Sequence, residues 1–84
     1  MARQEKLIAK LRQKSSDFTW GDLVSLLKGL GYKQVKPGKT AGSRRRFLHP
    51  DHGFISLHQP HPGNLLKKYQ LIQIIEVFEQ EGLI

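Results

Sequence analysis

Two stretches of this sequence carry apolar residues at the spacing of one face of an α-helix. Their positions follow the pattern i, i+3, i+4 and i+7, which places four side chains on one stripe. The stripes consist of Leu23, Leu26, Leu27 and Leu30 in the first stretch, and of Leu71, Ile74, Ile75 and Phe78 in the second. A chain of 84 residues has room for only one small core. The pattern therefore predicts helices over residues 20–30 and 70–81 that are buried against the same core.

Residues that favour helix ends stand at the limits of both stretches. Thr19 is a candidate N-cap for the first helix, and Asp22 follows it at the spacing of a capping box. Gly31 and Gly82 follow the two stripes, where glycine can adopt the left-handed conformation that ends a helix without steric cost. These signals support two separate helices with defined limits.

The segment between the two helices has the features of a β-hairpin. Residues 43–48 and 53–58 read as strands, and the turn between them contains Pro50, Asp51 and Gly53. Residues 32–36 form a weaker candidate strand. The expected fold class is α+β: a three-stranded antiparallel sheet with helices on one face, in the order α-β-β-β-α. Residues 1–18 are expected to form an N-terminal helical extension and connector, whose helix docks loosely or frays, and residues 19–84 the domain itself.

Positive charge is concentrated in the middle of the chain. The net charge is +7, and seven lysines and arginines but no acidic residue lie between Asp22 and Asp51. Such a distribution is typical of a protein that binds a polyanion, so we expect a nucleic acid partner. The alternative is a solvated surface that is basic without a partner.

Several function classes are disfavoured by what the sequence lacks. There is no cysteine, hence no disulfide and no thiolate metal site. The four histidines fall in or beside irregular segments, so we expect no metal ion and no cofactor. No apolar run is long enough to cross a membrane, and no signal-peptide pattern follows the basic start, so a cytoplasmic location is expected.

The hairpin and the segment after it combine phosphate-binding side chains with proton carriers. Arginine presents a planar fork of donors that matches phosphate oxygens, and histidine exchanges protons near neutral pH. The residues are Arg44, Arg45 and Arg46 in the first strand, His58 and His61 at the end of the second strand and beyond it, and the pair Lys67 and Lys68. Alternation puts Arg44 and Arg46 on one face of the sheet and Arg45 on the other. The sequence leaves open which face is buried.

The order of elements and several short motifs resemble the HicA toxin family. The motifs are Trp20-Gly21-Asp22-Leu23-Val24-Ser25-Leu26-Leu27, Leu30-Gly31-Tyr32, Gly42-Ser43 followed by Phe47, His61 followed by Leu66-Lys67-Lys68, and Gly82-Leu83. The resemblance covers residues 19–84. It implies a fold like the double-stranded RNA-binding domain and the toxin of a type II toxin–antitoxin system. Such a toxin is an mRNA interferase, a metal-independent endoribonuclease that is neutralised by a HicB-like antitoxin.

One position departs from the family. The family's catalytic histidine directly follows Gly-Ser, where this chain has Arg44. An arginine stays protonated because its pKa exceeds about 12, so Arg44 can hold a phosphate but cannot act as a base. We therefore expect Arg44 to clamp the scissile phosphate while His58 or His61 transfers protons. The residues expected to bind RNA are Lys39, Ser43, Arg45, Arg46, Lys67 and Lys68.

Two function classes remain open at this stage. The first is an RNA-cleaving toxin, and the second is a non-catalytic RNA-binding module on the same fold that has lost activity with the histidine. A DNA-binding partner of a repressor-type antitoxin is a third reading. Whether this chain is an enzyme depends on a histidine lying within reach of an arginine-bound phosphate.

Overall fold

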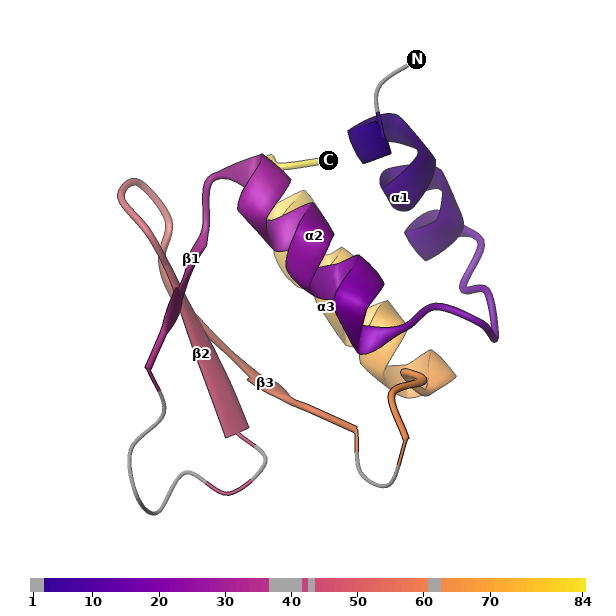
Figure 1. Cartoon of the computed structure of the whole chain (residues 1–84). Helices are drawn as coiled ribbons and strands as arrows, with labels where there is room; N and C mark the ends of the chain where they lie inside the picture. The colour runs from indigo at the N-terminus through magenta and orange to yellow at the C-terminus, as the bar shows by residue number, and fades with distance from the viewer. Residues whose placement is uncertain (1–2, 37–41, 43, 61–62) are drawn as a thin grey trace.

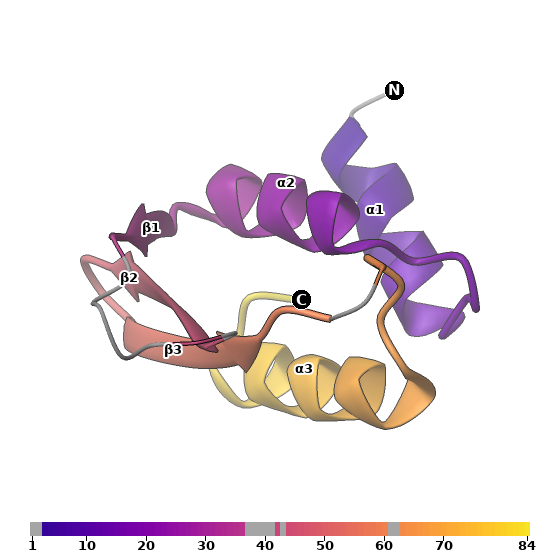
Figure 2. The same cartoon turned by 60° about the horizontal axis from the view of Figure 1, so that its bottom comes forward.

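The computed structural model describes residues 3–36, 42, 44–60 and 63–84. Its elements are α1 (Arg3–Arg12), α2 (Trp20–Leu30), β1 (Lys33–Val35), β2 (Arg44–His49), β3 (Gly53–His58) and α3 (Lys68–Gln80). The three strands form one antiparallel sheet in the order β1-β2-β3. Helices α2 and α3 lie side by side on one face of this sheet (Figures 1 and 2). The α+β class and the order α-β-β-β-α after α1 are confirmed.

Local signals in the sequence account for the limits of α2. The Thr19 hydroxyl accepts a hydrogen bond from the Asp22 N–H at 3.0 Å, and the Asp22 carboxylate accepts one from the Thr19 N–H at 3.2 Å. This is the predicted capping box. Gly31 ends the helix with φ 106°, and a Cβ atom there would lie 2.8 Å from Nε2 of His49. Gly31 is therefore required both by its conformation and by the close approach of the imidazole.

The core forms where the two apolar stripes meet the sheet. Phe47 of β2 is fully buried, and Ile55 of β3 is 8% exposed. The buried side chains of the two helices are Trp20, Leu23, Leu26 and Leu27 from α2, and Leu71, Ile74 and Phe78 from α3. Leu30 and Ile75 lie at the edges of their stripes and are only partly buried. The sheet is thus covered by helices on one face and leaves its other face open.

The expectation that the N-terminal helix docks loosely or frays is wrong. Leu11 is fully buried, and Leu7 is 7% exposed in the same core. The Gln4 side-chain amide donates a hydrogen bond to the Leu26 carbonyl at 3.1 Å. Helix α1 lies on the side of α2 that faces away from the sheet (Figure 1). Two leucines one turn apart dock α1 on the core, because the outer side of α2 and α3 offers them an apolar surface.

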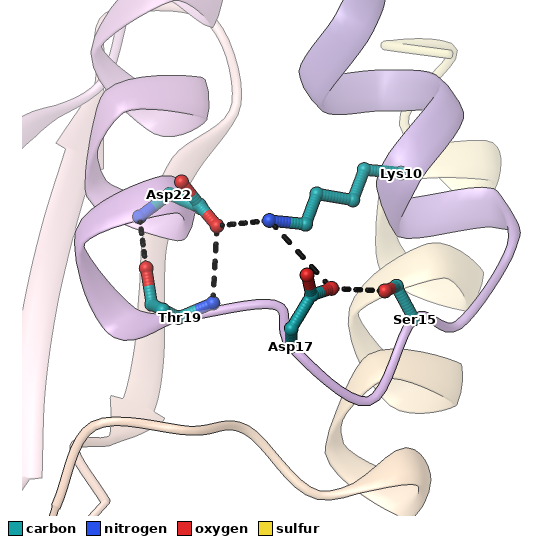
Figure 3. A network of polar contacts seen from close by, with 5 residues as sticks. All are labelled: Lys10, Ser15, Asp17, Thr19 and Asp22. Atoms are coloured by element: carbon teal, nitrogen blue, oxygen red, sulfur yellow. Dashed lines mark hydrogen bonds and ion pairs between the residues drawn. The ribbon is translucent and has the colours of Figure 1, made fainter.

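A charged network joins α1 to the start of α2 (Figure 3). The Lys10 ammonium donates to the Asp22 carboxylate at 2.9 Å and lies 3.7 Å from Asp17, which also accepts a hydrogen bond from Ser15. Burial raises the pKa of Asp22, but the hydrogen bonds from Lys10 and from the Thr19 backbone outweigh burial and lower this pKa below its usual value. Asp22 therefore caps α2 and anchors α1 with the same carboxylate.

None of the helices in the described ranges combines the length and the apolar character that a membrane span requires.

Candidate nucleic-acid interface

The two faces of β2 differ sharply in exposure. Phe47 and His49 face the helices and are buried, whereas Arg44, Arg46 and Leu48 lie on the open face and are exposed. This difference shows which face of β2 is buried, a question that alternation in the sequence left open. The helices supply apolar cover for Phe47, and the arginines keep their charge in water.

Arg45 is separated from the other two arginines by the same alternation. It is half-buried on the helix-facing side of β2. Its Nη1 donates hydrogen bonds to the carbonyl of Gly42 at 2.7 Å and to that of Arg44 at 2.9 Å. In this position Arg45 supports the backbone at the start of β2.

The strand register brings Arg44 and His58 together. Arg44 pairs directly with His58 across the sheet, and Arg46 pairs with Ser56. Residues directly opposite each other in an antiparallel pair share a face, with Cβ atoms about 4.5–5.5 Å apart. His58 is exposed. His58 therefore lies on the open face, at the end of the sheet, directly opposite Arg44.

A second basic residue, Lys67, lies near His58 at the start of α3. The Gln70 side chain links the two elements: its Oε1 accepts from the Lys67 N–H at 3.0 Å, and its Nε2 donates to the His58 carbonyl at 3.4 Å. His58, Lys67 and Gln70 line a pocket of about 320 Å³ together with Gln59, Pro60, Leu65 and Tyr69. The start of a helix also carries partial positive charge. His58 thus pairs with Arg44 across the sheet and shares a pocket with Lys67.

The remaining predicted residues are less closely grouped. Lys68 is the first residue of α3 and is exposed, but it does not line this pocket. Lys39, Ser43 and His61 lie outside the described residues.

The other two described histidines have structural roles at the opposite end of the hairpin. The Asp51 N–H donates to Nδ1 of His49 at 2.9 Å, so Nε2 carries the proton and donates to the Leu30 carbonyl at 3.0 Å. Nδ1 of His52 lies 2.8 Å from the Glu81 carboxylate. No set of three or more metal-ligating side chains gathers among the residues that the structure describes.

One exposed residue on the open face was not among the predicted site residues. Phe54 is 56% exposed, and the guanidinium carbon of Arg46 lies 4.2 Å from the centre of its ring. Phe54 lies two residues before Ser56 and four before His58, which places all three on the same face of β3. The signal that could have found it is an aromatic residue beside arginines on an unburied strand face.

This arrangement can bind a phosphate and exchange protons with a group held beside it. Arg44 and Lys67 supply positive charge that does not depend on pH near neutrality, and His58 supplies an imidazole that can accept or donate a proton. These groups come from three elements, β2, β3 and the start of α3, whose relative positions are fixed by the sheet register and by Gln70.

Comparison with known proteins identifies the family. The family model described as HicA toxin of bacterial toxin–antitoxin matches residues 20–82, which include α2, the three strands and α3. No curated protein and no solved structure matches the chain. Because the match spans most of the sequence and the whole sheet with both covering helices, the chain belongs to the HicA toxin family.

Proposed function

We propose that this protein is the toxin of a type II toxin–antitoxin system and that it cleaves mRNA without a metal ion. The observation that carries this proposal is the direct pairing of Arg44 with His58 on the open face of the sheet. Membership of the HicA toxin family supports the toxin class. The proposed place of action is the cytoplasm.

The proposed reaction is attack of a ribose 2′-hydroxyl on the adjacent phosphorus. The new bond joins the 2′-oxygen to phosphorus, the bond to the 5′-oxygen breaks, and the products are a 2′,3′-cyclic phosphate and a 5′-hydroxyl end. Arg44 holds the non-bridging oxygens and stabilises the charge that develops on them. His58 accepts the proton of the 2′-hydroxyl, and a protonated histidine returns one to the leaving 5′-oxygen. His61 is the second candidate for proton transfer.

The other residues expected to bind RNA are proposed to hold the phosphates beside the cleaved one. This set comprises Lys39, Ser43, Arg45, Arg46, Lys67 and Lys68. A cognate HicB-like antitoxin with an acidic surface would neutralise the toxin by covering the same groups, since opposite charge favours both the encounter and the fit of two proteins. RNA and the antitoxin would then compete for the same surface of the toxin.

The test is cleavage of an end-labelled transcript by purified protein in the presence of a chelator. We expect fragments with 2′,3′-cyclic phosphate ends from the unmodified protein and none from His58→Gln, because glutamine forms hydrogen bonds but does not titrate near neutral pH. His52→Gln is the matched control and should cleave normally. Unchanged cleavage by a His58→Gln, His61→Gln double variant would retain the enzyme and reject these catalytic residues.

Arg44 also favours a second candidate, a non-catalytic RNA-binding module. Arginine occupies the position of the family's catalytic histidine and cannot act as a base. If the protein binds the transcript, leaves it intact in the tube, and fails to arrest growth when expressed, the binding module is the correct function.

A further inference from the structure

The open face of the sheet carries a large aromatic side chain that the core does not use. Phe54 is 56% exposed and pairs across the sheet with Leu48, which is 40% exposed. The guanidinium carbon of Arg46 lies 4.2 Å from the ring centre, within the range of a cation–π contact. Contiguous apolar groups on a surface are characteristic of binding sites. Arg46 and Phe54 together present two flat groups, a positively charged guanidinium and an aromatic ring.

The charges around this pair select the kind of ligand. The register and the alternation of the strands define the residues of the open face among those described: Lys33, Val35, Arg44, Arg46, Leu48, Phe54, Ser56 and His58. None of them is acidic. A ligand that fits this face needs negative charge at regular intervals and flat apolar groups between the charges. A nucleic acid strand has both, in its phosphates and its bases.

The need for an accessible base favours a single strand over a duplex. Arg44 and Arg46 are two residues apart on β2, which corresponds to about 6.8 Å along the strand. Successive phosphates along one strand of a nucleic acid are separated by a similar distance, whether the strand is paired or not, so each arginine can contact one phosphate. A base can reach the Arg46–Phe54 pair only when it is not already stacked and paired within a helix, because a duplex exposes only its backbone and its grooves.

We propose that the open face binds single-stranded RNA by stacking a base on the Arg46–Phe54 pair, with neighbouring phosphates on Arg44 and Arg46. The proposal deepens the proposed function, since it assumes that RNA is the ligand, and it assigns the substrate class as unpaired rather than double-stranded RNA. It also places the bound strand on the face that carries the proposed catalytic residue, because Phe54 and His58 lie on the same face of β3, four residues apart.

The test compares the affinity of the protein for a labelled single strand of about 12 nucleotides with that for the corresponding duplex, across a range of salt concentrations. The RNA carries 2′-O-methyl riboses and is not cleaved. We expect tighter binding of the single strand. Phe54→Ala should weaken single-strand binding about 5- to 150-fold, the effect of losing one base–aromatic stack. It should leave the salt dependence unchanged, because no charge is lost.

Three further variants separate stacking from charge and from general surface effects. Arg46→Lys keeps the positive charge but loses the planar guanidinium, so it should weaken single-strand binding and leave the salt slope unchanged. Phe54→Tyr keeps an aromatic ring at this position, so it should bind the single strand about as tightly as the unmodified protein does. Ile72→Ala removes an apolar side chain that is 37% exposed on α3, away from the sheet, and should have no effect. Because Phe54 is not part of the core, circular dichroism should show Phe54→Ala to be folded; if it is not, Arg46→Lys decides.

The outcomes separate this proposal from the function on which it rests. No binding of either RNA by the unmodified protein would overturn the proposed function and this inference with it. Equal binding of single strand and duplex, with Phe54→Ala and Arg46→Lys both unaffected, would overturn this inference alone. Loss of antitoxin binding by Phe54→Ala with RNA affinity intact would also overturn it and assign the face to a protein partner.

Discussion

The two ends of the β2–β3 hairpin both carry histidines, but the two ends use them in opposite ways. At the turn end, His49 is buried with both ring nitrogens hydrogen-bonded, and His52 contacts Glu81. These contacts hold the turn against the ends of α2 and α3. Replacing the His49 imidazole would leave two backbone groups without partners, and replacing that of His52 would remove its contact with the Glu81 carboxylate, so their role is structural.

At the other end, His58 is exposed opposite Arg44, and its imidazole makes no hydrogen bond within the described part of the chain. Only its backbone carbonyl is engaged, by Gln70. The comparison teaches that the partners of a histidine, and not its presence beside a strand, distinguish a structural role from a chemical one. It also means that stability and activity should separate between the two ends.

The largest expected effect is on catalysis at the open end. His58→Gln should reduce the cleavage rate by about 10²–10⁴-fold, the usual contribution of a general acid or base. Its free energy of unfolding should change by no more than about 0.5 kcal/mol, as for most surface substitutions. Initial rates on a labelled transcript and urea unfolding measure the two quantities. A large loss of stability would show that the open end is structural as well.

The converse effect is expected at the turn end. His49→Ala should lower the free energy of unfolding by about 1–3 kcal/mol, because the buried imidazole is lost and the part-buried Asp51 N–H and Leu30 carbonyl lose their partner. The cleavage rate per folded molecule should stay close to that of the unmodified protein. Urea unfolding and active-site titration test this, and a stable but inactive His49→Ala protein would contradict the assignment.

The salt dependence of RNA affinity compares a charge at the open end of the hairpin with a charge on α2. Arg44→Ala should reduce the slope of log affinity against log salt by about 0.7 for a single strand, the share of one phosphate contact. Lys28→Ala removes an exposed charge near the end of α2 and should leave the slope unchanged. Equal changes for both variants would mean that the protein responds to net charge alone and has no defined contact surface.

Acid sensitivity of the fold is expected from the Asp22 network, which joins α1 to the start of α2. The pKa of Asp22 is lower in the folded protein than the value of about 3.9 expected when unfolded. Its contribution to stability is therefore fully present above that value and is lost as the pH falls through the folded pKa. Asp22→Asn should flatten the pH dependence of the unfolding free energy below pH about 4. An unchanged acid profile would exclude the Asp22 network as a source of acid sensitivity.

Much of the fold was predictable because its signals are local. The stripes and the Thr19–Asp22 capping box specify the helices, and the turn at Pro50 to Gly53 specifies the hairpin. The buried face of β2 was not predictable, because both faces carry an apolar residue, Phe47 or Leu48, and the packing of the helices decides between them. The docking of α1 was missed because it depends on the surface formed by other elements.

The candidate site was predictable in part for the same reason. The pairing of Arg44 with His58 follows from the turn, which sets the register of the hairpin. The approach of Lys67 depends on how α3 packs beside β3, and the hydrogen bonds of Gln70 could not be inferred from spacing. Nothing in the sequence marks His49 as structural, because its partners Leu30 and Asp51 are backbone groups brought to it by the fold.

The most direct test of the open face as the RNA-binding surface is titration of the isotope-labelled protein with a short single-stranded RNA, followed by NMR. The expected result is a set of amide shift changes confined to β2, β3 and the first turn of α3. These changes should centre on Arg44, Phe54 and His58, and α1 should be unaffected. Changes that centre on α1 and α2, with β2 and β3 unperturbed, would contradict the account.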